Sequence, residues 1–434
     1  MAEKLTEQKK LEQRMLTPAP KLPYRFMALL SRVLYCKKFG VKFNYNIDLK
    51  QYRGKSYVVV SNHASRYDHA FTAPAFFPDT LNYVVGYNEF FRSHLAGLLR
   101  TLNVIPKKNF VPYPYSVKQM IRVIRQGGRI MIMPEGMSSI SGANQPCAVG
   151  SGQLLKYLGV PVLYTKISGG YLTSTKYCLD DRPGRVEVTV DLLLSAEELS
   201  RMSEEEIQQY LNEKLYHDDY EWNKTAKVRF KGKNEMAKNL HTLLFWCPKC
   251  KKMLTMKSEG NTIECTACGN KANLNEYYEL TAQGEDSLIP STPKVWFDMQ
   301  RSEVRKMVGS DNFELKENVK IGTLPEYGFL KKQATSEITG EGTLILNKSG
   351  LHFKGTKKGE VFEFDIAPKF LPTYGMCTDV SRFYTFVEGQ FIEFYPEKAS
   401  AELWMMATEE NHRLNGGAWQ DCYLKNEDAC ETSM

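Results

Sequence analysis

Between residues 40 and 195, short apolar runs alternate with amphipathic segments of helical periodicity. The apolar runs predict strands at residues 57–61, 81–86, 129–133, 161–167 and 186–192. The amphipathic segments predict helices at residues 66–75, 92–102, 115–126 and 152–158. A charged helical segment follows at about residues 196–215, with Ser195 as its N-cap. This alternation predicts an α/β fold class, in which helices cover the faces of a sheet.

Further regions follow this domain. The segment at residues 276–335 is mixed and interrupted by prolines, and the region from about Gly340 is β-rich and ends in a helix at residues 400–414. We divide the chain into a basic N-terminal arm at residues 1–20, the α/β domain at 21–200, a helical extension at 201–244, a cysteine module at 245–275, a connector at 276–335, a β-rich domain at 336–415 and a tail at 416–434.

Positive charge is concentrated at the start of the chain. The net charge is +7, and residues 1–55 hold 13 Lys or Arg against 4 Asp or Glu. This surplus favours an acidic partner surface, either membrane headgroups or nucleic acid, and the alternative is a solvated arm. Residues 25–39 add an amphipathic helix with basic edges, whose apolar side packs either on its own domain or on lipid. Its apolar side chains are Phe26, Leu29, Leu30, Val33 and Leu34.

Two features bear on the location of the protein. The longest unbroken apolar runs are about five residues, whereas a membrane-spanning helix needs about 20. The first residues are charged and contain no apolar stretch of the kind that a secretory signal has. We therefore expect a cytoplasmic protein, bound peripherally at the cytoplasmic face of a membrane if its basic start binds anionic lipid.

A histidine and an aspartate follow the strand predicted at residues 57–61. His63 and Asp68 lie five residues apart, and within one helix this spacing turns the second side chain about 140° from the first. The two side chains therefore meet only if His63 ends the strand and Asp68 belongs to the next element. In that arrangement the carboxylate holds the Nδ1 proton and leaves Nε2 free as a general base. The alternative is a structural histidine, because H-x4-D is common by chance.

The strand predicted at residues 129–133 also ends in polar residues. Glu135, Gly136, Ser138 and Ser139 follow it directly. If this strand is a parallel neighbour of the strand before His63, both loops open at the carboxyl edge of the sheet, where ligands bind in such folds. The alternative is a tight turn followed by a capped loop.

Together these motifs resemble the glycerolipid acyltransferases of the lysophosphatidic acid acyltransferase type. The resemblance covers about residues 25–195 and rests on the order and spacing of four blocks. The blocks are Asn62, His63 and Asp68; then Asn88–Phe91, Gly97 and Asn103–Lys108; then Pro134, Glu135 and Gly136; and then Val160, Pro161 and Val162.

The resemblance implies a mixed sheet flanked by helices, and transfer of a fatty acyl group from a thioester, acyl-CoA or acyl carrier protein, to a glycerol hydroxyl. His63 would deprotonate the hydroxyl, and Asp68 would orient the imidazole. The implied acceptor is a lysophospholipid, with 1-acyl-glycerol-3-phosphate first. The implied substrate-binding residues are Asn62, Lys108, Glu135, Gly136, Ser138 and Ser139.

The chain departs from the family at positions that bear on the acceptor. Ser138 and Lys108 stand where the family usually has arginine, and Tyr164 replaces a frequent proline. Lysine can bind phosphate as a point charge, but serine supplies no charge. An acceptor without phosphate, or with a different head group, is therefore a rival expectation.

Four of the ten cysteines form a C-x2-C-x14-C-x2-C pattern, which predicts a zinc ribbon at residues 245–275. The expected ligands are Cys247, Cys250, Cys265 and Cys268. Four thiolates leave no open coordination position, so the Zn²⁺ would be structural. Lysines surround the module, but it has few aromatic side chains for base stacking, so we do not expect nucleic acid as a partner.

The β-rich domain at residues 336–415 resembles a pleckstrin-homology or GRAM-like barrel by pattern only, and the alternative is an unrelated small β domain. Three functions are therefore compared. The first is a peripheral membrane acyltransferase, the second is a catalytically inactive membrane- or protein-docking scaffold, and the third is a nucleic-acid-binding protein.

Overall fold

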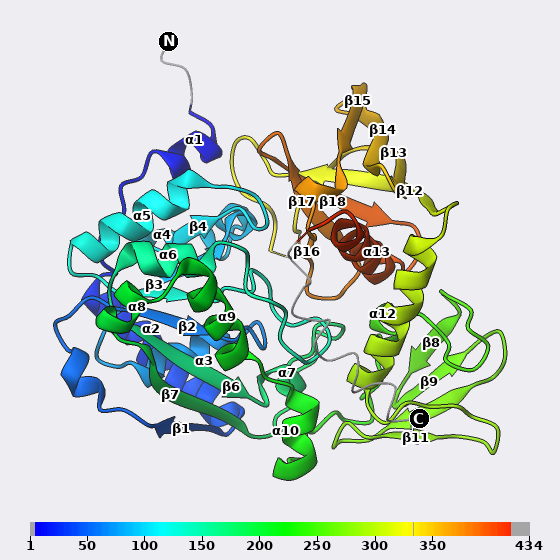
Figure 1. The fold of residues 1–434 in the computed structure, drawn as a ribbon, viewed down its shortest axis with the longest axis horizontal. Coiled ribbons are helices and arrows are strands. Elements are labelled where there is room, and N and C mark those ends of the chain that lie inside the picture. The colour runs from blue at the N-terminus through cyan, green and yellow to red at the C-terminus, as the bar shows by residue number, and fades with distance from the viewer. Residues whose placement is uncertain (1–4, 333, 418–434) are drawn as a thin grey trace.

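The computed structural model describes residues 5–332 and 334–417 (Figure 1). In the described residues the strands form three sheets, of seven, four and seven strands. The α/β domain lies on the left of Figure 1, the four-stranded sheet at the lower right, and the C-terminal sheet at the upper right. Helix α12 (Pro293–Gly309) connects the last two. Within the described ranges, no helix combines the length and the apolar character that crossing a bilayer requires.

The first sheet has the strand order β1-β7-β6-β2-β5-β3-β4. Its central strands run parallel, β7 is antiparallel to β6, and β1 is parallel to β7. The sheet is therefore mixed, as expected. The strands are β1 (Val41–Tyr45), β2 (Val58–Ser61), β3 (Asn82–Gly86), β4 (Ile105–Lys107), β5 (Ile130–Ile132), β6 (Val162–Ser168) and β7 (Val186–Leu194).

Two of these strands were not predicted. Strand β1 lies at the sheet edge and is mostly exposed, so its sequence carries no apolar run. Strand β4 has three residues and contains Pro106, which argues against a strand in sequence analysis although it is tolerated at an edge.

Helices cover this sheet close to their predicted positions. They are α3 (Asp68–Ala75), α4 (Ala96–Thr101), α5 (Pro114–Arg125) and α6 (Ser151–Leu158). The short helix α7 (Gly170–Thr173) was not predicted. The charged segment expected as one helix is two, α8 (Ala196–Arg201) and α9 (Glu204–Leu215). A second capping box at Ser203 and Glu206 restarts the helix, because Ser203 accepts from the Glu206 amide as Ser195 does from Glu198.

The N-terminal segment packs on the α/β domain instead of extending as an arm. Helix α1 (Glu7–Glu12) and the residues after it bury Leu11, Leu16 and Ala19. Helix α2 (Lys21–Ser31) and the π-helical turn η1 (Arg32–Cys36) follow. Tyr24, Ala28 and Cys36 are buried, whereas the predicted apolar stripe is not: the side chains of Phe26, Leu29, Leu30, Val33 and Leu34 are 45–69% exposed, and the neighbouring Leu22 is 83% exposed.

The cysteine module contains the antiparallel strands β8 (Met256–Glu259), β9 (Thr262–Cys265), β10 (Lys271–Leu274) and β11 (Leu280–Ala282). Helices α10 (Asp219–Ala226) and α11 (Leu240–Leu243) connect it to the α/β domain. Trp246 is buried between this module and α12, where its carbonyl accepts from the indole of Trp296 at 2.8 Å. The module is therefore packed into the protein and is not suspended on a linker.

The C-terminal sheet is antiparallel, with the order β15-β14-β13-β12-β18-β17-β16. It begins earlier than the predicted boundary at residue 336, because β12 (Glu314–Thr323) pairs with both β13 and β18. The connector thus contributes a strand. Helix α13 (Ala401–Leu414) packs against α12 and caps the sheet. The other strands are β13 (Glu337–Asn347), β14 (Gly350–Lys357), β15 (Glu360–Ile366), β16 (Gly375–Met376), β17 (Phe383–Val387) and β18 (Gln390–Pro396).

Candidate active site

The His63–Asp68 contact is present. Strand β2 ends at Ser61, and Asp68 is the first residue of α3, so the chain turns between the two residues as the spacing requires. The Nδ1 atom of His63 lies 2.8 Å from Oδ2 of Asp68. Asp68 is buried and also accepts from the amide and hydroxyl of Ser65, whereas the side chain of His63 is 24% exposed. A carboxylate fixed on Nδ1 leaves Nε2 available for proton transfer.

Glu135 contacts the backbone of His63 and is completely buried. Its carboxylate accepts from the amide of His63 at 2.6 Å and from the amide of Gln145 at 3.0 Å, and the side chain of Asn144 donates to it as well. Burial raises the pKa of Glu135 to about 8. Both oxygens are therefore occupied by the protein, and Glu135 holds the backbone of His63 in place.

Asn62, like Glu135, uses its side chain to hold the backbone in place. Its side chain donates to the carbonyl of Ile167 at 2.8 Å and accepts from the Ile167 amide at 2.7 Å. The pair fastens the end of β2 to its parallel neighbour β6. Strand β2 is also a parallel neighbour of β5, so the loops that carry His63 and Glu135 leave the same edge of the sheet.

The rest of the β5 loop is folded on itself. The amide of Ser139 donates to the carbonyl of His63 at 2.7 Å, and its hydroxyl donates to the carbonyl of Ala143 at 2.6 Å. Gly136 has φ +81° and faces the ring of Phe110 so closely that a Cβ would lie 3.0 Å from it. The Ser139 amide therefore joins the β5 loop to the histidine loop, whereas Gly136 faces Phe110.

Lys108 is placed away from open solvent. Its Nζ donates to the carbonyl of Gly389 at 2.9 Å, lies 3.5 Å from the carboxylate of Glu12, and lies over aromatic rings that include Tyr113 at 5.0 Å and Phe386 at 5.7 Å. The N-terminal segment and the β17–β18 turn thus both contact this lysine. In this conformation its charge is directed at groups of the protein itself.

Ser138 meets a residue that no motif indicated. Its hydroxyl accepts from Nζ of Lys176 at 3.1 Å. Lys176 follows α7 and is 6% exposed. The sequence contains no local signal for this contact, because the two residues are 38 positions apart and lie in different loops.

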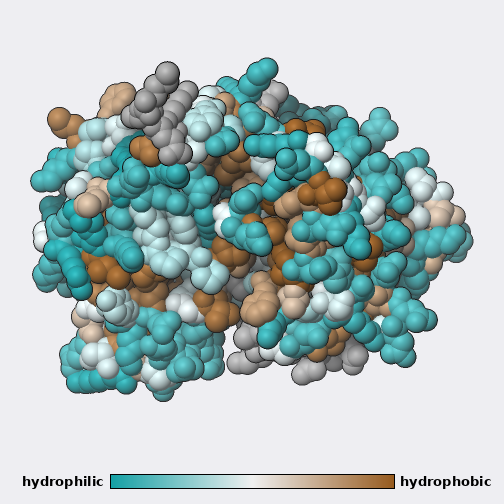
Figure 2. Space-filling view, turned by 90° about the horizontal axis from the view of Figure 1, so that it is seen from above, coloured by the Kyte–Doolittle hydropathy of each residue, from teal (hydrophilic) through white to brown (hydrophobic). Residues whose placement is uncertain are grey.

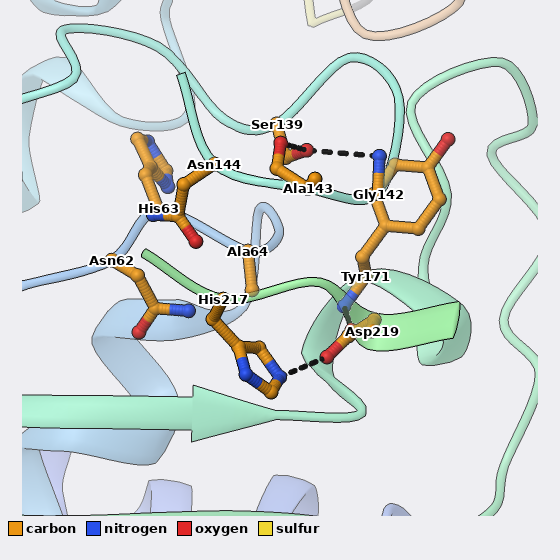
Figure 3. A pocket seen from close by; sticks show the side chains of 10 residues that line it. All are labelled: Asn62, His63, Ala64, Ser139, Gly142, Ala143, Asn144, Tyr171, His217 and Asp219. Atoms are coloured by element: carbon orange, nitrogen blue, oxygen red, sulfur yellow. Dashed lines mark hydrogen bonds and ion pairs between the residues drawn. The ribbon is translucent and has the colours of Figure 1, made fainter. Parts of the chain in front are cut away.

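A second histidine–aspartate pair lines the same cavity as His63 (Figure 3). Nε2 of His217 is 2.8 Å from Oδ1 of Asp219, and Asp219 also accepts from the amides of Gly169 and Tyr171. The amide of Asn144 donates to the carbonyl of His217. These residues and His63 line a cavity of about 10 Å³, roughly the volume needed for one water. Sequence analysis missed this pair, because its neighbours along the chain form no recognisable motif.

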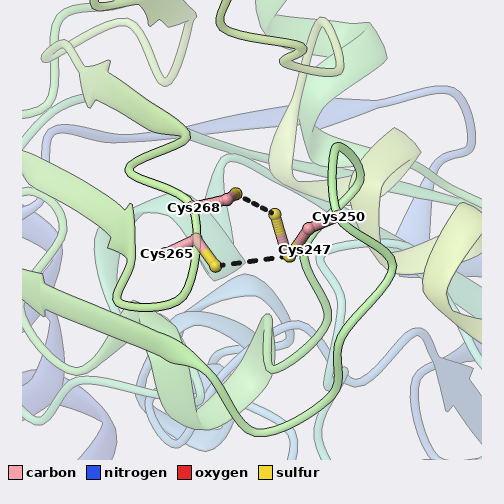
Figure 4. Close-up of side chains that lie close together, drawn as sticks. All are labelled: Cys247, Cys250, Cys265 and Cys268. Carbon is pink, nitrogen blue, oxygen red and sulfur yellow. Dashed lines mark hydrogen bonds between the residues drawn. The ribbon is translucent and has the colours of Figure 1, made fainter.

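The four predicted zinc ligands converge (Figure 4). Their sulfur atoms all lie within 4.8 Å of one another, with Cys247 and Cys268 at 3.6 Å and Cys250 and Cys265 at 3.7 Å. A Zn–S bond of about 2.3 Å gives a tetrahedron whose edges are about 3.8 Å. The cluster therefore has the size and the donor set of a four-thiolate metal site.

Comparison with known proteins agrees with this geometry. Residues 42–166 match the family model described as Acyltransferase. This range contains β2, β5, His63, Asp68 and Glu135.

The chain is also similar to a solved structure, the crystal structure of the 1-acyl-sn-glycerophosphate (LPA) acyltransferase PlsC from Thermotoga maritima. The identity is 18%, the TM-score is 0.38, and the match covers 44% of this chain and 76% of that chain. No curated protein matches the chain.

Proposed function

We propose that this protein is a peripheral membrane O-acyltransferase that moves a fatty acyl group from a thioester to the free hydroxyl of a lysophospholipid, with 1-acyl-glycerol-3-phosphate as the leading acceptor. The observation that carries the proposal is the 2.8 Å contact between His63 and Asp68 at the carboxyl edge of the sheet. It lies within the residues that match the acyltransferase model.

The geometry supports a general-base mechanism. Asp68 accepts the Nδ1 proton of His63, so Nε2 takes the proton of the acceptor hydroxyl as its oxygen attacks the thioester carbonyl. The C–S bond then breaks, and the imidazolium returns the proton to the leaving thiolate of coenzyme A or of an acyl carrier protein. An ester and a free thiol result. General-base assistance of this kind contributes roughly 10²–10⁴ in rate.

The remaining predicted substrate residues divide between two roles in this proposal. Asn62, Glu135 and Ser139 bond to protein groups and position the histidine loop. Ser138, at the half-buried surface of the β5 loop, and Gly136 stay candidates for acceptor contact. Lys108 would bind an acceptor phosphate only after exchanging its contacts with Gly389 and Glu12.

The four-cysteine cluster would hold Zn²⁺ through Cys247, Cys250, Cys265 and Cys268. All four positions are then filled by protein, so the ion would stabilise the fold of the module without entering the reaction.

The exposed apolar side of α2 and η1 supports membrane docking. Phe26, at 69% exposure, and Val33, at 64%, lie on this surface beside the exposed Arg32 and Lys37. Apolar side chains with cationic neighbours on one helical surface are typical of segments that lie in the interface of anionic bilayers. In the view of Figure 2, which looks onto the top of Figure 1, the molecular surface is mainly hydrophilic, and its apolar residues gather mostly along the hollow between the left and right halves.

The test is an acyl-transfer assay with purified protein, acyl-CoA or acyl carrier protein as donor, and a panel of lysophosphatidic acid, other lysophospholipids and monoacylglycerol. We expect transfer to lysophosphatidic acid and loss of at least 10²-fold of the rate in His63→Ala. Transfer only to a different acceptor would keep the chemistry and change the substrate. If folded, zinc-loaded protein transfers the acyl group to none of these acceptors, the proposed acyltransferase activity is refuted.

One observation favours a second candidate, a docking scaffold without catalysis. The cavity that His63 lines has room for about one water and not for a glycerolipid. In that case the protein would bind vesicles and partner proteins but transfer no acyl group, and the same assay separates the two functions.

A further inference from the structure

Lys176 is a buried cation, and the described part of the chain places no counter-ion in direct contact with it. It is 6% exposed, and within residues 5–332 and 334–417 its Nζ forms one hydrogen bond, to the neutral hydroxyl of Ser138, and no ion pair within 4.0 Å. A buried ammonium is costly unless an anion and further acceptors compensate it. Burial lowers the pKa of Lys176 to about 8, which leaves the amine mostly protonated at neutral pH.

Two of the acidic groups around Lys176 pair with arginine, and a third, Glu402, is buried without a hydrogen-bond partner in the described residues. Glu89 pairs with Arg92 at 3.1 Å, and Asp379 lies 3.6 Å from Arg382 and accepts from Ser381. Glu402 interacts electrostatically with Lys176 without a hydrogen bond to it, and burial raises the pKa of Glu402 well above its usual value and also raises that of the Cys377 thiol, which favours the neutral form of both groups. The charge of Lys176 is therefore only partly offset by its surroundings.

A hydrogen bond links this cation to the β5 loop, which in turn contacts the backbone of His63. Ser138 precedes Ser139, whose amide donates to the carbonyl of His63 at 2.7 Å. The hydrogen bond from Lys176 therefore ends on a hydroxyl one residue away from the histidine loop. Ser174 adds a second hydroxyl close by in the chain, which is buried and has no hydrogen-bond partner in the described structure. A cation and unpaired donors beside a general base form a suitable binding site for an anionic substrate.

We propose that Lys176 binds the anionic head group of the acceptor, so that Lys176 and Ser138 form the phosphate subsite of the enzyme. This inference rests on the proposed acyl transfer, and it names the acceptor class as a phosphomonoester. The phosphate supplies the missing counter-charge, and Ser138 supplies a hydroxyl donor when the ammonium turns to the phosphate. Lys108, which contacts Gly389 and Glu12, is not needed for this role.

The experiment compares two acceptors that differ only in the phosphate, 1-acyl-glycerol-3-phosphate and 1-monoacylglycerol. Lys176→Met removes the charge, Lys176→Arg keeps it, and Lys118→Met is the control, because Lys118 is exposed on α5 and lines no part of the site. We expect Lys176→Met to raise KM for the phosphorylated acceptor by about 10- to 100-fold and to leave KM for monoacylglycerol unchanged. Lys176→Arg should restore most of the difference.

Stability separates this role from a structural one. Removing an uncompensated buried charge should leave the unfolding temperature unchanged or raise it, whereas removing a structural contact should lower it. Equal KM changes for both acceptors, or losses that follow a fall in unfolding temperature, would overturn the proposal. Ser138→Ala serves as the second variant, and it should raise KM for the phosphorylated acceptor but not for monoacylglycerol.

Failure of the proposed function can be told from failure of this inference. If the wild-type protein transfers to neither acceptor, binding of glycerol 3-phosphate is measured by titration calorimetry. Binding that disappears in Lys176→Met but not in Lys118→Met would support the anion site without the enzyme. No binding by the wild-type protein, or equal binding by Lys176→Met, would overturn the site itself.

Discussion

Glu135 is the buried group whose removal should perturb the candidate active site most. Its carboxylate accepts from the His63 amide, the Gln145 amide and the Asn144 side chain. Glu135→Ala removes the acceptor for all three donors at once. Because the site is completely buried, these donors cannot turn to bulk water without moving the loop that carries His63.

The destabilisation expected for Glu135→Ala follows from the three donors that lose their acceptor. A buried donor left without a partner costs about 1–3 kcal/mol, so three donors give about 3–6 kcal/mol after partial relaxation. Glu135→Gln keeps the oxygen that faces His63 and replaces the one that faces Gln145 with an amide nitrogen. It therefore loses one acceptor, and we expect about 1–3 kcal/mol. Glu135→Ala should therefore lower both the stability and the transfer rate more than Glu135→Gln does.

The measurement is urea unfolding followed by far-UV circular dichroism, read at the first transition because the chain has several domains. Glu197 provides the matched control. It lies on the surface helix α8, where its side chain is 70% exposed and pairs with Arg201, so Glu197→Ala should change stability by no more than about 0.5 kcal/mol. If Glu135→Ala unfolds within 1 kcal/mol of that control and retains full activity, Glu135 does not hold the histidine loop and the reasoning fails.

Four further outcomes are expected. Raising the pH from 5 to 8 should destabilise the wild-type protein more than it destabilises Glu135→Gln in the same unfolding assay. The reason is that the pKa of Glu135 is raised to about 8 in the folded protein, so over this range the folded state still holds a proton that the unfolded state has released. Asp68→Asn should lower the transfer rate by at least tenfold with little change in KM, since it leaves the ring of His63 in place but removes the anion that stabilises the imidazolium. Leu29→Glu with Val33→Glu should reduce co-sedimentation with anionic vesicles and leave the unfolding temperature unchanged, because both side chains are exposed. Chelation of zinc from the purified protein should release about one ion per chain and lower the unfolding temperature, and an unchanged unfolding temperature after complete removal would exclude a structural metal.

The parts of the fold and the site that could be predicted from sequence are those with local signals. The strand before His63 is fully buried and therefore appears as an unbroken apolar run, and its end fixes where the histidine lies. The cysteine spacing is local in the same way. Lys176 and His217 have no such signal, because they reach the site from segments after β6 and after α9, and only tertiary packing brings them there. The mainly exposed strand β1 was missed because edge strands carry little apolar pattern.

The structure also changes how the predicted domains relate to one another. The buried cluster that contains Phe71 and Phe90 of the α/β domain also includes Leu330, Tyr384 and Phe386 from beyond the cysteine module. Asp219, from the helical extension, accepts the amides that begin α7. A chain ending at residue 200 would therefore expose part of its own core and lose this support. The region that matches the acyltransferase model is thus completed by the rest of the chain, and the later domains are part of the same folded unit as the proposed site.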